Sequence, residues 1–286
     1  MSILGFSDEG GNGHLLVAGK KDFRDARAFL AERLLLTTPQ NQGKWQSLDI
    51  SKSSIHDTYE LLNVTMMYQM PQTVKGAQKH IDPDLPWSEK HFQERVGRKP
   101  INPGVEHANW PYHANGADLH VKGGKYDHNY MERIWPKGLS RKVELRNGLD
   151  ETLSSGEFRF SGYRFPVGDL DDVVTQLASD LGTRQAYLPI WFPEDTGATA
   201  GQRVPCSLGY HFIIRDGLLH VQYNLRSCEI YRHFTNDIYM AVRLGQWVAE
   251  QLALTHNVDV SLGQLTTHVV SLHGFVGDTA KIEELQ

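Results

Sequence analysis

A thiol, a guanidinium with an adjacent hydroxyl, and a carboxylate lie close together in the sequence and could carry covalent chemistry. Cys206 follows a proline, Arg226 precedes Ser227, and Asp237 opens a long apolar segment. A cysteine nucleophile works best beside a cation, and a guanidinium also binds phosphate through parallel hydrogen bonds. The residue types leave two interpretations of Cys206. It is either a nucleophile or a small buried hydrophobic residue, which is the usual role of a free cysteine.

The order of motifs around these residues resembles the family of thymidylate synthases and pyrimidine nucleotide hydroxymethylases, closest to the cytidylate (dCMP or CMP) 5-hydroxymethylases. That family shows Pro-Cys, a strand pair around Asp-Gly, Arg-Ser-Cys-Asp, and then Asn-Ile or Asp-Ile at a helix start. The matching residues here are Pro205-Cys206, Asp216-Gly217, Arg226-Ser227-Cys228-Glu229 and Asp237-Ile238. Thr183-Arg184-Gln185 resembles the family's Ser-Arg-Arg, and Leu272-His273-Gly274-Phe275 resembles its Ala-His-Leu-Tyr.

The resemblance implies an α+β fold of thymidylate synthase type, with a mixed β-sheet packed against helices and a sheet face used for dimerisation. It implies one domain over residues 1–286. Within it, the prolines and glycines of residues 79–125, together with Trp110 and Tyr112, predict a long ordered loop region. It also implies a homodimer in which Arg184 reaches into the neighbouring subunit's site. The one-carbon donor would be 5,10-methylenetetrahydrofolate.

The same resemblance implies a role for each candidate site residue. Cys206 would attack C6 of a pyrimidine ring, which makes C5 a carbon nucleophile. The 5′-phosphate would be bound by Arg184, Arg226 and Ser227. His273 would contact the sugar, and Glu229, in the place of the family's aspartate, would contribute to substrate binding.

The family also needs a glutamate that handles protons near C4 and C5. Its usual sequence setting is degraded here. We expect Glu89 to take this role, with Glu94 as the second and Glu106 as the third candidate; each could instead be a solvent-facing glutamate. Tyr130 is the expected active-site tyrosine, with Tyr126 as the alternative.

Asp237 carries the information about the base. Thymidylate synthases have asparagine there, which pairs with uracil, whereas an aspartate resembles the cytidylate hydroxymethylases and suits the amino group of cytosine. Two alternatives stay open: Asp237 only caps the helix, or a register shift puts Asn236 in the base site. The chain ends at Gln286, soon after the last expected strand, which favours a more open site and water as the final reactant.

These residues predict a hydroxymethyltransferase acting on CMP or dCMP. The alternatives are methylation of dUMP and a non-catalytic homologue that binds nucleotide or RNA. The net charge of -5 and the absence of a long basic block argue against a general nucleic-acid surface. Only two cysteines are present, so we expect a reduced cytoplasmic protein. No apolar stretch is long enough to cross a bilayer, and the histidines form no compact metal motif.

Hydrophobic periodicity predicts an α+β protein in which helices and strands mix without strict alternation. Helical spacing of apolar residues predicts helices over residues 21–36, 53–70, 88–96, 169–181 and 237–254. Apolar runs predict strands over residues 186–192, 210–214, 218–225 and 263–271. The pair Asp216-Gly217 between two of these runs predicts a β-hairpin.

Overall fold

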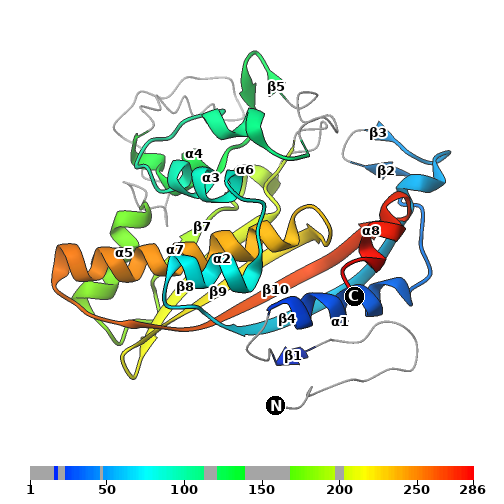
Figure 1. Ribbon diagram of the computed structural model, residues 1–286. Coiled ribbons are helices and arrows are strands. Elements are labelled where there is room, and N and C mark those ends of the chain that lie inside the picture. The colour runs from blue at the N-terminus through cyan, green and yellow to red at the C-terminus, as the bar shows by residue number, and fades with distance from the viewer. Residues whose placement is uncertain (1–15, 19–22, 46–47, 113–120, 139–167, 197–202) are drawn as a thin grey trace.

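The computed structural model describes residues 16–18, 23–45, 48–112, 121–138, 168–196 and 203–286. Its frame is a six-stranded sheet of order β1-β4-β10-β9-β8-β7 (Figure 1). The strands are β1 (Leu16–Ala18), β4 (Thr58–Gln69), β7 (Tyr187–Pro189), β8 (Ser207–Arg215), β9 (Leu218–Glu229) and β10 (Ser261–Phe275). The sheet is mixed, because β10 pairs parallel with β9 and antiparallel with β4.

Two short ribbons and several helices complete the described fold. The ribbons pair β2 (Lys44–Trp45) with β3 (Leu48–Asp49), and β5 (Val121–Lys122) with β6 (Lys125–Tyr126). The α-helices are α1 (Phe23–Leu35), α2 (Val74–Ile81), α3 (Trp87–Arg95), α4 (Tyr130–Ile134), α5 (Leu170–Ser179), α6 (Pro193–Thr196), α7 (Phe234–His256) and α8 (Thr279–Glu283). Single 3-10 turns are η1 (Ser54–His56), η2 (Val105–Asn109), η5 (Pro136–Gly138) and η6 (Val276–Asp278).

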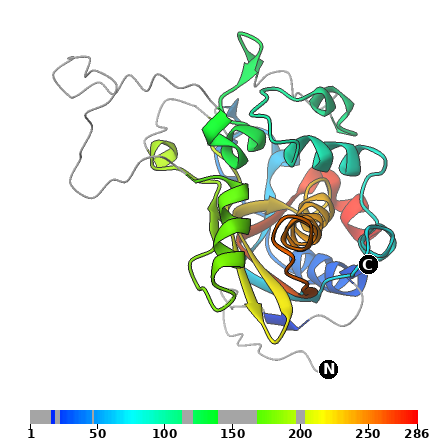
Figure 2. The same cartoon turned by 90° about the vertical axis from the view of Figure 1, so that its left-hand side faces the viewer.

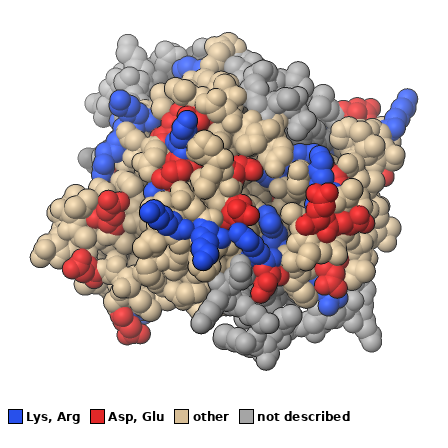
Figure 3. All heavy atoms as spheres, in the orientation of Figure 1, with Lys and Arg blue, Asp and Glu red and all other residues tan. Residues whose placement is uncertain are grey.

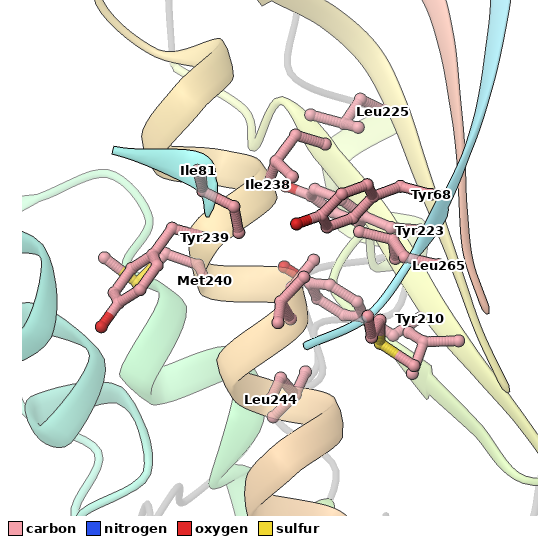
Figure 4. Packing of buried hydrophobic residues seen from close by; sticks show 14 of the residues in the cluster. Tyr68, Ile81, Tyr210, Tyr223, Leu225, Ile238, Tyr239, Met240, Leu244 and Leu265 are labelled. Atoms are coloured by element: carbon pink, nitrogen blue, oxygen red, sulfur yellow. The ribbon is translucent and has the colours of Figure 1, made fainter. Parts of the chain in front are cut away.

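Helix α7 lies across the sheet and is the centre of the core. It packs against β9 and β10, and α1 covers β4 on the same side of the sheet (Figures 1 and 2). Figure 4 shows Ile238 of this helix beside the sheet residues Tyr68 and Tyr223, all of them buried. Burying large apolar side chains in this way is the main favourable term in folding. The helix therefore holds its first turn rigidly against the ends of the central strands.

The first turn of α7 begins earlier than the sequence predicts. The sequence predicts a start at Asp237, but the helix begins at Phe234. The Phe234 side chain is buried, and its ring packs at a tilt against that of Phe23 with ring centroids 5.6 Å apart. The N-cap residue is His233, and Asp237 donates its backbone N–H to the His233 carbonyl. Asp237 is therefore inside the helix, and the alternative that it only caps the helix is wrong.

The helix predicted over residues 53–70 is also wrong, because most of this segment forms strand β4. Val64, Met66 and Tyr68 are buried and alternate with more accessible residues, which is the period of a strand with one face in the core. A short apolar stretch satisfies both helical and strand spacing, and the pairing partner decides between them. Here β4 pairs with β10 along almost its whole length.

Most of the other predicted elements are confirmed with small changes in their bounds. Helices α1, α3 and α5 occupy the predicted segments, and Asp169 forms a capping box with Asp172 at the start of α5. The strand predicted over residues 186–192 is shorter, as β7. The hairpin joins longer strands than predicted, and its turn has positive φ at Asp216 (51°) and Gly217 (71°), as a type I′ turn requires.

Helix α4 is fixed to its neighbours by buried polar contacts. Arg133 makes two hydrogen bonds to the carboxylate of Asp195, at 2.6 and 2.8 Å, and both side chains are buried. The indole N–H of Trp135 donates to the carbonyl oxygen of Arg95 at 2.7 Å. These contacts tie α4 to α3 and to the segment after β7, and so they fix the position of Tyr130 at the start of α4.

Acidic and basic side chains are interspersed on the described part of the face in Figure 3, without a large field of one sign. Such a surface does not have the electrostatic footprint of a general nucleic-acid binder on that face. Among the described residues, no helix combines the length and the apolar character that crossing a bilayer requires.

Candidate active site

Cys206 and Arg226 meet where the central strands end. Cys206 immediately precedes β8, and Arg226 lies near the end of the adjacent strand β9. A guanidinium nitrogen of Arg226 lies 3.7 Å from the Cys206 sulfur, and the Ser227 hydroxyl lies 3.6 Å from it. The partly accessible thiol thus has a cation and a hydroxyl donor as neighbours. This is the environment in which a cysteine acts as a nucleophile.

Arg226 also holds the chain that carries the thiol. Its Nε donates to the carbonyl oxygen of Pro205 at 2.9 Å, and an Nη donates to that of Val204 at 3.1 Å. The backbone N–H of Arg226 donates to the carbonyl oxygen of Cys206 at 2.9 Å. The Arg226 side chain therefore both orients the segment before Cys206 and places a positive charge beside the Cys206 sulfur.

A hydroxyl network continues from the thiol into the core. The Ser207 hydroxyl contacts the Tyr223 hydroxyl at 2.6 Å and donates to that of Tyr130 at 3.2 Å. Burial raises the pKa of Tyr130 above that of free tyrosine, and the neighbouring Cys206 adds to this effect. Tyr130 is therefore a neutral hydroxyl near Cys206. The structure brings this predicted tyrosine to the site.

Asp237 faces the same group of residues from the first turn of α7. The Cys228 thiol donates to its Oδ2 at 3.4 Å. Burial raises the pKa of Asp237 to about 6, while Arg95 and the Cys228 hydrogen bond act in the opposite direction. A carboxyl group that titrates near neutrality next to a nucleophile is a common feature of functional sites.

The side-chain amide of Asn236 is bonded away from Cys206. Its Oδ1 accepts from the Ser88 hydroxyl at 2.7 Å and from the backbone N–H of Asp84 at 3.1 Å. Its Nδ2 donates to the Asp84 carboxylate at 2.8 Å and to the Arg232 carbonyl at 3.2 Å. The amide is buried and has both donor and acceptor partners, so Asp237 is the residue that faces the site.

Glu89, the preferred proton-handling candidate, is not brought to Cys206. Its carboxylate accepts from Arg243 at 2.9 Å through two nitrogens and from the Tyr239 hydroxyl at 2.5 Å. At about 100° per residue, Tyr239 lies on the opposite side of α7 from Asp237. Glu89 therefore links α3 to α7, and none of these contacts connects it with the nucleophile.

The other two candidate glutamates, Glu94 and Glu106, lie close to each other. Glu94 Oε1 accepts from the backbone N–H of Glu106 at 3.1 Å, and Glu94 Oε2 lies 3.3 Å from His91 Nδ1. The Glu106 carboxylate accepts from the Asn109 side chain at 3.1 Å. Neither carboxylate touches Cys206.

The remaining predicted residues lie at different distances from the centre of the site. Glu229 is buried, and its two oxygens accept from the backbone N–H groups of Tyr231 (3.0 Å) and Arg232 (2.5 Å), so it holds the turn before α7. Burial raises the pKa of Glu229 to about 7 against these two hydrogen bonds. His273 pairs with Glu229 across the strands, and its pKa is lowered by burial. Arg184 is exposed at the β7 edge of the sheet and has no described contact with Cys206.

Two arginines of the site were missed in the sequence. Arg203 lies near Cys206, Tyr130 and Arg226, and its pKa is lowered chiefly by burial. Its guanidinium makes no hydrogen bond to a described residue, since only its backbone groups do. Arg95 stacks over the Tyr130 ring at 4.3 Å. Neither arginine belongs to a recurring pattern, so nothing in the sequence distinguished them from surface arginines.

A group of aromatic rings lies where the loop that contains Trp110 and Tyr112 meets the start of α7. Trp110 stacks on His233 with centroids 5.2 Å apart, and Tyr112 lies edge-on to Tyr231 at 5.8 Å. Aromatic faces of this kind can stack on a flat heterocycle. No group of three or more potential metal ligands occurs among the described residues.

The raised pKa of Asp237 predicts a pH-dependent effect of Asp237→Asn on stability. A carboxyl whose folded pKa lies above its unfolded value stabilises the fold below pH 3.8 and loses that contribution as the pH rises through about 6. The variant avoids this loss. Its free energy of unfolding should therefore gain on the wild type by about 1–2 kcal/mol between pH 5 and pH 8.

Urea unfolding at several pH values measures this difference. Asp216→Asn, in the exposed hairpin turn, is the matched control for removing one negative charge. If the difference in the free energy of unfolding between Asp237→Asn and wild type stayed constant from pH 5 to pH 8, Asp237 would not be a carboxylate destabilised by burial.

Sequence comparisons give relatives with one common name. No protein-family model matches the chain. It is 31% identical over 159 residues to a protein of Methanothermobacter thermautotrophicus named "Putative thymidylate synthase", covering 52% of this chain and 68% of that one. A protein of the same name from Methanococcoides burtonii is 29% identical over 139 residues, covering 49% and 60%. The chain thus spans about three fifths to two thirds of the length of these relatives.

The structural comparison agrees. The thermostable thymidylate synthase A from Bacillus subtilis superposes with a TM-score of 0.57 at 13% identity, covering 92% of this chain and 83% of that chain. At this identity the likeness shows the fold, and it confirms the α+β thymidylate synthase-like fold expected from the motifs. From the fold, the ordered motifs and the identity to the archaeal relatives, we conclude that the chain belongs to the thymidylate synthase family.

Proposed function

We propose that the protein is a one-carbon transferase that moves a unit from 5,10-methylenetetrahydrofolate to C5 of a cytidine monophosphate, CMP or dCMP, and releases the 5-hydroxymethyl product. The observation that carries this proposal is the position of Asp237. It faces the Cys206 side of the site from α7, while Asn236 is fully bonded to the segment before α3.

The choice of base follows from donor and acceptor chemistry. Cytosine offers an amino donor at C4 and an acceptor at N3, whereas uracil offers an acceptor and a donor. An aspartate accepts from the amino group, and in its protonated form it also donates to N3. A pKa of about 6 makes both forms accessible near neutral pH. An aspartate at this position also resembles the cytidylate hydroxymethylases of the family.

The proposed reaction uses the residues around the thiol in sequence. The Cys206 sulfur forms a bond to C6 of the base, and the electrons of the C5–C6 double bond make C5 nucleophilic. C5 would then take up the one-carbon unit and lose its proton, tetrahydrofolate would leave the exocyclic carbon, water would add to that carbon in its place, and the sulfur would leave C6. Arg226 and Ser227 stabilise the thiolate before attack and after release, since both lie within 3.7 Å of it.

The arginines near the thiol also account for a phosphate. Arg226 is largely occupied with backbone carbonyls, whereas the Arg203 guanidinium is free of described partners and lies in the same region. We add Arg203 to Arg226 and Ser227 as a candidate phosphate ligand. Arg184, exposed at the edge of the sheet, would contribute to the site of the second subunit of a homodimer.

The residues at the site also fit the folate. The rings of Trp110, Tyr112 and Tyr231 offer flat apolar surface next to His233 at the start of α7, which suits a pterin ring. When bound there, methylenetetrahydrofolate would supply the carbon at the oxidation level of formaldehyde. The protein's part is to orient the two substrates and to control the access of water.

Cys206→Ser should abolish turnover and leave nucleotide binding largely intact. The alcohol is a much weaker nucleophile than a thiolate, while the phosphate and base contacts do not involve the sulfur. Product formation and calorimetric nucleotide binding measure the two effects. Cys228→Ser is the matched control, because it changes the buried thiol that contacts Asp237 and leaves the nucleophile in place. Near-normal rates for Cys206→Ser would rule out covalent catalysis at this residue.

The wild type should prefer cytidylates, and Asp237→Asn should shift the preference toward uridylates. A buried polar group left unpaired costs about 1–3 kcal/mol, or roughly 5- to 150-fold in kcat/KM. The test is mass spectrometry of products from CMP, dCMP, UMP and dUMP with methylenetetrahydrofolate. The mass distinguishes a 5-hydroxymethyl from a 5-methyl product.

Asn236→Ala is the control for this substitution, because it should cost stability without changing the base preference. A wild type that converts dUMP to a methylated product in preference to cytidylates would replace this proposal with thymidylate synthesis. Nucleotide binding without any product would indicate a non-catalytic homologue.

Inactive subunits should complement each other if Arg184 acts across a dimer interface. In a heterodimer of Cys206→Ala and Arg184→Ala subunits, one of the two sites regains every wild-type residue. Random mixing should restore about a quarter of the wild-type activity. The matched control mixes Cys206→Ala with Arg226→Ala subunits. Each of these substitutions damages the site of the subunit that carries it, so both sites of the heterodimer stay inactive and no activity should return. Absence of recovery in verified Cys206→Ala and Arg184→Ala heterodimers would show that Arg184 does not act in trans.

A further inference from the structure

A chain of three charged or polar side chains runs along α3 toward the site. Glu94 Oε2 lies 3.3 Å from His91 Nδ1, and Arg95 Nε donates to His91 Nε2 at 3.1 Å. Because a guanidinium can only donate, Nε2 must be the accepting nitrogen of the ring. Nδ1 therefore carries the hydrogen and donates to Glu94. The three side chains thus have defined roles as acceptor, bridge and donor.

The outer end of this chain is sealed by the following loop. The backbone N–H of Glu106 donates to Glu94 Oε1 at 3.1 Å. A Cβ on Gly104 would lie 2.3 Å from Glu94 Oε2, so the loop backbone packs directly on the carboxylate. Burial lowers the pKa of His91 to about 4, with a further contribution from Arg95, so the imidazole is neutral at physiological pH. The bridge is consequently a rigid, uncharged ring.

The inner end presents a cation to the site. The Arg95 guanidinium lies 4.3 Å from the centre of the Tyr130 ring, and the residue is 9% exposed. A cation held over a tyrosine face in a desolvated position is attracted by the ring. Its two terminal nitrogens make no hydrogen bond to a described residue, and a small void of about 10 Å³ borders Arg95 and Tyr210.

We propose that Glu94, His91 and Arg95 form a relay that fixes one positive charge against the Tyr130 ring, which makes Arg95 a positioning residue for the base-reading carboxylate Asp237. The role of Asp237 rests on the proposed function, whereas the relay itself rests on the contacts above. Glu94, the second of the three candidate glutamates, belongs to this relay, whereas the first candidate, Glu89, is bonded to Arg243 and Tyr239.

The relay has an electrostatic consequence for Asp237. The titratable neighbours of Asp237 are Cys228 and Tyr223 on β9, Tyr210 on β8 and Tyr130 on α4. Burial raises the pKa of each of these groups, so they are protonated and neutral near pH 7. Arg95 is the cation that lowers the pKa of Asp237 against the effect of burial. Without Arg95, the carboxyl should remain protonated to higher pH.

A thermodynamic cycle tests the relay without any substrate. Urea unfolding from pH 5 to pH 9 is compared for wild type, Arg95→Gln, Asp237→Asn and the double variant. Arg95→Gln should shift the pH at which stability declines through Asp237 ionisation upward by on the order of one unit. This shift should disappear in the Asp237→Asn background. Changes at His91 and Glu229 occur in both backgrounds and cancel in the cycle.

Three variants keep the test decisive. Arg95→Lys retains the charge, so its pH dependence should lie close to that of the wild type, and it keeps the test usable if Arg95→Gln folds poorly. Glu94→Gln weakens the far end of the relay and should reproduce the shift in part. Arg98→Gln is the matched control, because it removes a nearby guanidinium that is exposed and bonded to Asp171. An equal pH dependence of Arg95→Gln in both Asp237 backgrounds would overturn the proposal.

Kinetics with a cytidylate provides the second readout. The limb of the kcat/KM profile that reports the ionisation of Asp237 should move to higher pH in Arg95→Gln and return toward the wild-type position in Arg95→Lys. If the wild type neither binds nor converts cytidylates, the proposed function fails, yet the unfolding cycle still decides on the relay. A shift in the unfolding cycle with an unchanged kcat/KM profile would show that the ionisation of Asp237 does not limit turnover.

Discussion

The geometry of the site depends on the Arg226 side chain. Its guanidinium bonds the carbonyls of Val204 and Pro205 and lies 3.7 Å from the Cys206 sulfur. The strand that carries Arg226 pairs with β8 on one side and β10 on the other, so its position is set by the centre of the sheet. A short irregular segment is thereby given the rigidity of a central strand, and preorganisation of this kind is what a nucleophile requires.

The second constraint is the burial of the first turn of α7. Phe234, Asn236 and Ile238 are buried on sides of the helix that leave Asp237 directed at the site. Burial makes the ionised carboxylate unfavourable, and the cation on α3 opposes that effect. The site therefore combines a thiol beside one arginine with a carboxyl group tuned by another. Arg226 lies on the sheet and Arg95 lies on helix α3. The electrostatics of the site therefore depend on how α3 and α7 pack against the sheet.

The sequence was most informative where function depends on neighbours in the chain. Cys206, Arg226, Ser227 and Tyr130 were predicted from local motifs, and the structure brings them together. Strand β4 was mistaken for a helix because its spacing fits both periods and only pairing with β10 decides. Glu89 was expected in the site, and its ion pair with Arg243 could not be predicted because the two residues are far apart in the sequence. Arg95 and Arg203 were missed for the same reason, since their surroundings form only on folding.

The most direct measurement of the central claim is exchange of the hydrogen at C5 of a cytidylate in heavy water. Addition of the Cys206 sulfur to C6 makes C5 basic, so C5 takes up deuterium before the sulfur leaves. Proton NMR follows the loss of the C5–H signal. The account predicts exchange of CMP or dCMP by the wild type, with no exchange by Cys206→Ser at nucleotide concentrations that saturate both proteins. Equal exchange by both proteins, or none by a wild type that binds the nucleotide, would contradict the account.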